Sequence, residues 1–138
     1  MAMKVEISSA ALDRIVAAAA ASPEAEICGL LFGEPTRIVA VEGCRNVAAD
    51  PARRFEIDPA ALLAAHRRAR AGGMRLIGCY HSHPTGTAAP SPRDAADAAP
   101  DGGIWLIAAG GRVTAWRAVV DGPVHGRFAA LTIDPQPD

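Results

Sequence analysis

The sequence has few aromatic residues, no long basic tract and no long apolar run. Aromatic residues make up 4% of the 138 residues, and the formal net charge is −1. A surface that binds nucleic acid normally combines clustered lysine and arginine with rings for base stacking. The alanine-rich runs also fall short of the roughly 20 apolar residues that a membrane helix needs. The composition therefore argues against nucleic acid and membrane as partners.

Cysteine is scarce, and its spacing suggests no pairing. The 3 cysteines, Cys28, Cys44 and Cys79, form an odd set without a Cys-x-x-Cys pair. Such a set is typical of reduced thiols, not of a disulfide framework or a structural zinc site. The amino-terminal stretch shows no apolar segment after a basic start, which a secretory signal would have. We therefore expect a cytoplasmic protein whose cysteines are small buried side chains.

What is present is the composition of a globular domain. Hydrophobic residues make up 50% of the chain and charged residues 21%. The length fits one domain, and neither an internal repeat nor a linker divides it. We expect residues 1–138 to form a single domain, with residues 133–138 as a frayed tail.

Proline, glycine and serine mark the ends of the expected elements. Asp58-Pro59 is typical of a helix start, and Gly110-Gly111 of a hairpin turn. Helices are expected at 8–22, 58–71 and 91–99, and strands at 4–7, 26–34, 36–46, 74–83, 103–109, 112–120 and 125–133. Strands and helices are mixed, and the last three strands follow one another. This order predicts an α/β fold, a single layered domain with a mixed β-sheet flanked by helices.

A His-x-His pair stands at the end of one expected strand. Side chains at i and i+2 of a strand point to the same face, so His81 and His83 project together. Two such imidazoles can converge on one metal ion with bonds of about 2.0–2.1 Å. Pro84 stops the strand, and the following loop, with Gly86 and Pro90, can return the chain over the pair.

Asp94 is a natural third ligand in the first turn of the next expected helix. Two histidines, one carboxylate and a free position for water form the arrangement of a catalytic zinc site. A different interpretation is also open, because Ser91-Pro92-Arg93-Asp94 fits a helix capping box. Isolated histidines, such as His66 and His125, are more often ordinary core or surface residues.

The stretch HSHPTGTAAPSPRD resembles the signature of the JAMM/MPN+ (Mov34/MPN/PAD-1-like) zinc metallopeptidases. Their pattern is His-Ser/Thr-His-Pro followed by Ser-x-x-Asp, with an upstream glutamate. The resemblance includes EICGLLFGE and the segment from Arg53 to Pro84, and it covers roughly residues 22–120. It is strongest with the short, stand-alone bacterial type. It implies an MPN/JAMM domain with a layout like that of cytidine deaminases.

By this resemblance, His81, His83 and Asp94 bind one catalytic Zn²⁺ ion per chain. The upstream glutamate of the family is the general base, and the pattern Glu-x-Cys-Gly selects Glu26 over Glu24. Glu26 is expected to begin an apolar strand, where partial burial raises its pKa.

Two further residues near the motif have open assignments. Ser91 matches the family serine that hydrogen-bonds the developing oxyanion, and its alternative role is the N-cap of the helix. Cys28 is expected on the same strand face as Glu26, but a fourth protein ligand would displace the catalytic water. Ser82 is expected to support the loop from the opposite face.

The resemblance implies a peptidase or isopeptidase that cuts after the C-terminal Gly-Gly of a ubiquitin-like, sulfur-carrier protein. An extended tail of this kind can pair with an exposed strand edge. The candidate edge is RRFEID, with Phe55, Glu56 and Ile57 as substrate-binding residues, although an ordinary connecting strand fits it equally well. A homodimer is compatible with the sequence but not required by it.

Three other functions compete with this interpretation. A nucleobase deaminase needs His-x-Glu and Pro-Cys-x-x-Cys, which the chain lacks. A non-catalytic MPN scaffold would lose motif residues that are all present here. A zinc hydrolase of small amino-acid amides remains open. The chain also lacks the long second insertion of eukaryotic deubiquitinating members, which argues against linkage-specific cleavage of polyubiquitin.

Overall fold

The computed structural model of the protein describes residues 3–138, so residues 1 and 2 of the predicted domain lie outside the described part. In chain order the elements are β1 (Lys4–Ser8), α1 (Ser9–Ala20), β2 (Cys28–Glu34), β3 (Arg37–Cys44), α2 (Pro59–Arg70), β4 (Arg75–Ser82), α3 (Pro92–Asp97), β5 (Ile104–Ala109), β6 (Arg112–Gly122) and β7 (Gly126–Gln136).

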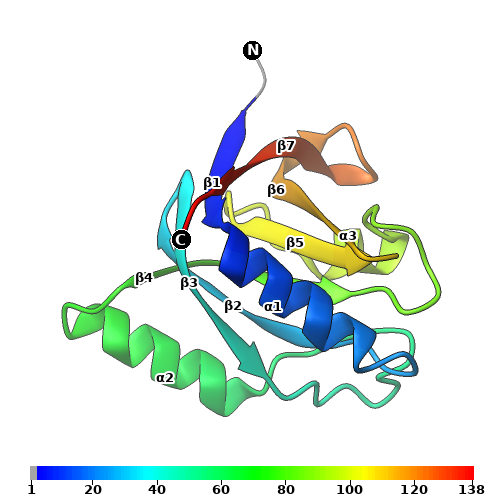
Figure 1. Cartoon of the computed structure of the whole chain (residues 1–138). Helices are drawn as coiled ribbons and strands as arrows, with labels where there is room; N and C mark the ends of the chain where they lie inside the picture. Colours follow the sequence, from blue (N-terminus) through cyan, green and yellow to red (C-terminus); the bar gives the residue numbers. More distant parts are fainter. Residues whose placement is uncertain (1–2) are drawn as a thin grey trace.

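The strands form a closed barrel in the order β1-β3-β2-β4-β5-β6-β7 (Figure 1). The pairs β1–β3, β1–β7 and β4–β5 are parallel, and the other neighbours are antiparallel. The expectation of a layered α/β sheet flanked by helices was therefore wrong. The sheet closes on itself, and the three helices are short.

The closure depends on the two ends of the described chain. β1 pairs with β3 on one side and with β7 on the other, from Lys4 opposite Thr132 to Ser8 opposite Gln136. Residues 133–136 therefore belong to β7 and do not form the expected frayed tail. Because this ladder joins segments more than a hundred residues apart, no local pattern in the sequence signals it.

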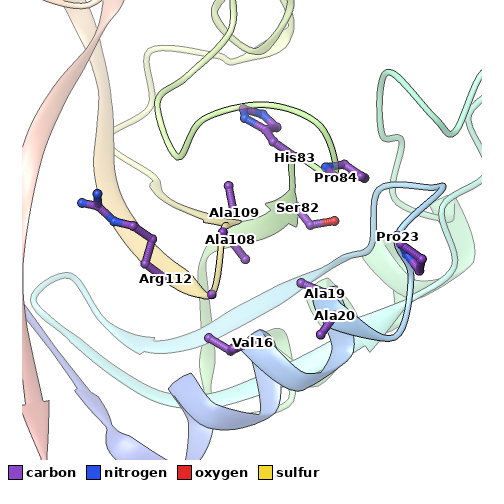
Figure 2. Close-up of a pocket in the computed structure, with 12 residues that line it drawn as sticks. Val16, Ala19, Ala20, Pro23, Ser82, His83, Pro84, Ala108, Ala109 and Arg112 are labelled. Carbon is purple, nitrogen blue, oxygen red and sulfur yellow. The ribbon is translucent and has the colours of Figure 1, made fainter.

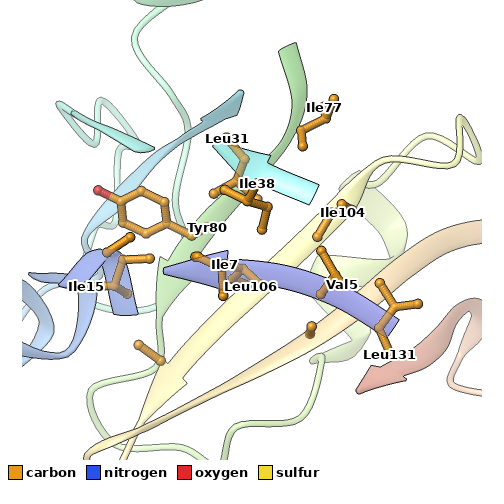
Figure 3. Packing of buried hydrophobic residues seen from close by; sticks show 13 residues of the cluster. Val5, Ile7, Ile15, Leu31, Ile38, Ile77, Tyr80, Ile104, Leu106 and Leu131 are labelled. Atoms are coloured by element: carbon orange, nitrogen blue, oxygen red, sulfur yellow. The ribbon is translucent and has the colours of Figure 1, made fainter. Parts of the chain in front are cut away.

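All seven strands contribute side chains to one apolar core. Figure 3 shows Val5 and Ile7 of β1 and Leu106 of β5 lying between Ile15 of α1 and Leu131 of β7. α1 starts at the predicted cap, where Ser8 Oγ accepts a hydrogen bond from the Ala11 N–H at 3.1 Å. Its buried face packs against β1, β5 and β6. The core fixes the strand ends that carry the site.

α2 covers a second apolar cluster on the side of β4. It starts at the predicted cap, where Asp58 accepts from the Ala60 N–H at 3.0 Å, with Pro59 at its first position. Ala65 of α2 is fully buried in this cluster, together with Leu30 and Ile57. Within residues 3–138, every helix is too short or too polar to cross a membrane.

The turn between β5 and β6 is the predicted glycine hairpin. Gly110 and Gly111 have φ values of 58° and 79°, which non-glycine residues rarely adopt. The tight turn brings Ala109 opposite Arg112 in the antiparallel ladder. On its other side, the end of β5 pairs with the end of β4, where Ala108 lies opposite Ser82.

Candidate metal centre and active site

His81 and His83 lie at the end of β4 with both rings on the same side. His81 is fully buried, and its backbone pairs with Cys28 of β2 and Ile107 of β5. The N–H of His83 donates to the Ala108 carbonyl of β5 at 2.9 Å. Since strands hold β4 on both sides, the two Nε2 atoms are fixed 3.0 Å apart.

Asp94 joins the two histidines from the first turn of α3. Its Oδ2 lies 3.1 Å from Nε2 of His81 and 3.1 Å from Nε2 of His83. The residue is buried. Within residues 3–138, these three form the one group of His, Cys, Asp or Glu side chains that could hold a metal ion.

Ser91 and Asp94 form a capping box, so the two interpretations of their spacing are compatible. Ser91 Oγ accepts from the Asp94 N–H at 3.0 Å, and Asp94 Oδ2 accepts from the Ser91 N–H at 3.0 Å. The same carboxylate oxygen therefore serves the cap and the cluster. Because the Ser91 hydroxyl acts as an acceptor here, its own hydrogen stays available for donation.

The hydrogen bonds of His83 direct a lone pair into the cluster. Nδ1 of His83 lies 2.7 Å from the Thr87 carbonyl, which can only accept, so in the neutral ring Nδ1 carries the hydrogen. Nε2 is then an acceptor, and it faces another imidazole nitrogen and a carboxylate oxygen. A tetrahedral zinc ion with bonds of about 2.0–2.1 Å spaces its ligand atoms about 3.3 Å apart. The donor set and its 3.0–3.1 Å spacings fit such a cation.

The loop that leads from the second histidine to α3 is held from outside. The Thr114 hydroxyl of β6 donates to the Ala88 carbonyl, and His125 Nε2 lies 3.1 Å from the Pro90 carbonyl. Both contacts were missed from the sequence, where His125 had been interpreted as an ordinary core or surface residue. His125 is exposed and outside the cluster, but it supports the approach to α3.

The surroundings of Asp94 and His81 favour the protonation states that bind a divalent cation, whereas those of His83 favour a proton that a cation would displace. Burial by itself would raise the pKa of Asp94, but hydrogen bonds from His81, His83 and the Ser91 backbone hold that pKa well below its usual range. Burial lowers the pKa of His81. Burial opposes protonation of His83 too, but the hydrogen bonds to Asp94 and to a backbone carbonyl raise its pKa. An ionised carboxylate beside imidazoles is the form in which these residues bind metal.

Glu26 lies two residues before β2, not at the start of a strand as expected. Its side chain is buried, and Oε1 has no hydrogen-bond partner within residues 3–138. Burial raises the pKa of Glu26 from 4.5 to about 7; the charge of His83 opposes this and that of Asp94 adds to it. A carboxylate that titrates near neutral pH is suited to general-base catalysis. Glu24, the other candidate, is exposed in the preceding turn.

Three distant residues hold the backbone around Glu26. Its N–H donates to the Pro51 carbonyl at 2.8 Å, and its carbonyl accepts from Asn46 Nδ2 at 3.0 Å. The next N–H, of Ile27, donates to Ser82 Oγ at 2.9 Å. Ser82 was expected to support the loop after the two histidines, but its hydroxyl bonds the chain before β2 instead, and the roles of Asn46 and Pro51 were missed. An asparagine where a strand meets irregular chain was the available signal, since its amide can bond backbone groups that have no ladder.

The segment predicted to bind substrate passes beside the cluster. The Phe55 ring stacks on the His81 ring with centroids 4.3 Å apart and an interplanar angle of 19°, and Trp105 meets both rings edge-on. The Ile57 side chain is buried under α2, and Glu56 is exposed. Because Phe55 and Ile57 use their side chains for packing, a ligand would have to bind this segment through its backbone groups.

The Cys28 thiol points away from the cluster and toward the end of β3. Its Sγ lies 3.7 Å from the Cys44 carbonyl and 3.6 Å from the Arg45 carbonyl. Burial raises the pKa of this thiol to about 12. Cys28 therefore stays a protonated thiol, and all three cysteines are free, as expected from their spacing.

Two hollows adjoin at His83 and Pro84. The first, of about 250 Å³, is lined by Glu26, Arg53 and Ser91 as well. The second, of about 240 Å³, lies between the alanines at the end of α1 and the β5–β6 turn, with Arg112 at its side (Figure 2). A chain that crosses the cluster can therefore find room on both sides of it.

Comparisons with known proteins agree with the motif. Residues 8–119 match the family described as prokaryotic homologs of the JAB domain. A desampylase from Haloferax volcanii is 36% identical over 100 residues, which cover 70% of this chain and 72% of that protein. A probable TtuB-protein conjugate cleaving protease from Thermus thermophilus is 45% identical over 53 residues, 38% of this chain and 36% of that protein.

A solved structure supports the fold. The solution structure of a protein from Desulfitobacterium hafniense superposes with a TM-score of 0.79, covering 99% of this chain and 94% of that one. At 23% identity, this likeness concerns the fold alone.

Proposed function

Because the chain belongs to the prokaryotic homologs of the JAB domain, we propose that it is a zinc-dependent peptidase or isopeptidase acting on conjugates of a ubiquitin-like protein. The observation that carries the proposal is a single hollow of about 250 Å³ lined by Glu26, His83 and Ser91. A buried acid, a hydroxyl and a metal ligand around one cavity are the groups that metal-assisted amide hydrolysis requires.

His81, His83 and Asp94 are the residues that would hold the zinc ion. Zinc bound there supplies Lewis-acid chemistry, which acidifies water and polarises a carbonyl group. Two histidines and one carboxylate form the donor set of catalytic zinc sites, which keep one position open. Within residues 3–138, no fourth His, Cys, Asp or Glu joins the group.

Glu26 is the residue that moves the proton. In its ionised form it takes a proton from the attacking water, and it then returns that proton to the leaving amine. The pKa of about 7 leaves a large ionised fraction at neutral pH and still allows the protonated form to donate. The unpartnered Oε1 is the oxygen that is free for this exchange.

Ser91 is the candidate donor to the oxyanion that forms on the scissile carbonyl. Its oxygen is fixed by the Asp94 N–H, so the hydroxyl is placed before substrate arrives. The remaining O–H can rotate toward the cavity that Ser91 lines. A preorganised donor of this kind stabilises charge as it develops.

The open edge at Phe55 and Ile57 is the proposed seat of the substrate tail. On its other side, Glu56 accepts from the Val47 N–H at 2.9 Å. Because backbone groups alternate along an extended chain, those of Phe55 and Ile57 face away from this pairing, and they make no hydrogen bond within residues 3–138. An added peptide strand would satisfy them.

The names of the relatives support a ubiquitin-like protein as the substrate. They are a desampylase and a probable TtuB-protein conjugate cleaving protease. We place the cut after a C-terminal Gly-Gly, because glycines pass where a side chain would meet the stacked Phe55 and His81 rings. The hollow beside Arg112 would then take the first residue after the cut.

The test uses zinc-loaded protein and Gly-Gly carriers from the same cell. Each carrier bears a short C-terminal extension or an isopeptide link to lysine, and intact-mass spectrometry identifies the products. We expect a fall in mass to the bare Gly-Gly end, with no product from Glu26→Gln. Hydrolysis of small amino-acid amides alone would favour the smaller substrate class. No hydrolysis of any substrate, with zinc bound, would contradict the proposal.

A further inference from the structure

Asn46 uses every hydrogen-bonding position of its side-chain amide. Nδ2 donates to the carbonyls of Glu26 and Arg54, both at 3.0 Å. Oδ1 accepts from the N–H groups of Ala48 at 3.0 Å and Glu56 at 3.1 Å. Since a primary amide offers two donors and two acceptor sites, this side chain is saturated by backbone partners alone.

These partners connect the candidate base with the candidate substrate edge. The Arg54 carbonyl and the Glu56 N–H are the backbone groups on either side of Phe55. The Glu26 carbonyl belongs to the residue whose carboxylate lines the cavity. One planar amide therefore fixes the separation between residue 26 and residues 54–56.

The barrel supports the neighbour of Glu26 but not the N–H and carbonyl of Glu26 itself. Glu26 precedes β2, and within residues 3–138 it is Ile27 that bonds to β4, with its N–H donating to Ser82 Oγ and its carbonyl accepting from the Ser82 N–H. Both backbone hydrogen bonds of Glu26 go to the segment after β3, the N–H to Pro51 and the carbonyl to Asn46. The position of the carboxylate therefore follows this irregular segment.

We propose that Asn46 is a positioning residue that holds Glu26 in register with the strand edge at residues 54–57. The inference rests on the proposed function, in which the edge seats the tail and Glu26 acts as the base. A tail paired at Phe55 and Ile57 is held at a set distance from Glu26, because the Asn46 amide bonds both to Glu26 and to the backbone beside Phe55. Rates of such reactions fall steeply when groups shift by about 1 Å. Asn46 therefore acts on kcat more than on binding.

Asn46→Asp is the informative substitution. It keeps Oδ1 and its two acceptor bonds, but it replaces the donor Nδ2 with an oxygen that repels the carbonyls of Glu26 and Arg54. Arg45→Ala is the matched control, because its side chain is exposed and the residue bonds its neighbours through its carbonyl. Zinc content and melting temperature identify any variant that fails to fold, and Asn46→Ala then serves as a second variant.

The first readout needs no substrate. In the free zinc-loaded protein, amide hydrogen exchange is followed by NMR. We expect exchange at Glu26 and Ile27 to rise by about 10-fold in Asn46→Asp, because the two hydrogen bonds that Nδ2 donates are lost. Amides in the middle of β2 should stay as in Arg45→Ala. Unchanged exchange at Glu26 and Ile27 would overturn the inference, whatever the enzyme's activity.

The second readout compares a carrier that has its full tail with a Gly-Gly amide that lacks the tail. In the wild type, pairing of the tail should raise kcat as well as lower KM. In Asn46→Asp, the ratio of the two kcat values should fall by about 10-fold, while the KM for the carrier stays similar. A general loss of stability would lower both kcat values together. An unchanged ratio of the two kcat values contradicts the inference. A wild type that cleaves neither substrate contradicts the proposed function. In that case the hydrogen-exchange measurement still decides the role of Asn46.

Discussion

The metal ligands and the base of the candidate site are held by different kinds of structure. His81 lies inside β4 with ladders to β2 and β5 on both sides, and Asp94 lies in a capped helix. Glu26 lies in irregular chain, and its two backbone hydrogen bonds go to Pro51 and Asn46. Regular structure therefore holds the cluster, and one backbone and one side-chain hydrogen bond to a loop hold the base.

This difference corresponds to different demands on the two parts. Ligand atoms must keep spacings close to those of a metal polyhedron, which the barrel provides. A base that works near neutral pH must be buried without a partner for its carboxylate, and this destabilises the fold. An irregular segment can keep Glu26 in that environment because distant residues satisfy its backbone.

The most severe way to break the cluster is Asp94→Ala. The substitution removes one ligand atom and also the carboxylate that caps α3. We expect zinc bound per chain to fall from about one to near zero after mild chelation, with turnover lost. Elemental analysis of the purified protein measures the metal. Asp97→Ala, at the exposed end of the same helix, is the control and should keep its zinc. Full zinc occupancy in Asp94→Ala would show that the cluster is not the metal site.

Glu26→Gln should separate the base from the cluster. The amide keeps the size of the side chain but cannot accept the proton from water. We expect kcat to fall by about 10²–10⁴-fold, the usual contribution of general acid–base catalysis, with zinc content unchanged. The measurement is the initial rate on the carrier conjugate. Glu24→Gln, in the exposed turn, should keep wild-type rates, and equal losses in both variants would refute the choice of Glu26.

The parts of the site that the sequence predicted are those specified by neighbouring residues. Asp58-Pro59 starts α2 as expected, and the Ser91–Asp94 spacing produces both a cap and an approach to the histidines. Strand periodicity alone places His81 and His83 on one face. These features depend on contacts over a few residues, which a linear pattern can record.

The features that were missed depend on contacts across the whole chain. The barrel closes because residues 132–136 pair with β1. The two prolines in the tail expected at residues 133–138 predicted no strand there. The sequence predicted that Glu26 begins a strand because the apolar run starts beside it, but its backbone bonds instead to Asn46 and Pro51. Tertiary hydrogen bonds decide such boundaries, and a single sequence does not display them.

Stability as a function of pH should show the destabilising effect of burying the base. The folded-state pKa of Glu26 is raised from 4.5 to about 7, so the folded protein favours the neutral acid. Its contribution to stability is complete below pH 4.5 and is lost as pH rises through 7. In metal-free protein, Glu26→Gln should therefore be more stable than wild type at pH 8, by about 3 kcal/mol, and no more stable at pH 4.

Chemical unfolding at the two pH values measures this difference. Zinc should reduce it, because a nearby positive charge favours the ionised carboxylate. If the difference in unfolding free energy between Glu26→Gln and wild type is the same at both pH values, Glu26 ionises in the folded protein as it does in water.

The smallest expected effect comes from a side-chain contact that links the chain beside Glu26 to regular structure. The Ser82 hydroxyl accepts from the Ile27 N–H at 2.9 Å, and it ties the chain after Glu26 to β4. Ser82→Ala leaves that buried N–H unpaired, which should lower the free energy of unfolding by about 1 kcal/mol and kcat only a few-fold. Ser82→Thr keeps the hydroxyl and should restore both values. If Ser82→Ala instead lowers kcat as much as Asn46→Asp does, the barrel positions the base as strongly as the loop does, and the contrast between the two parts of the site disappears.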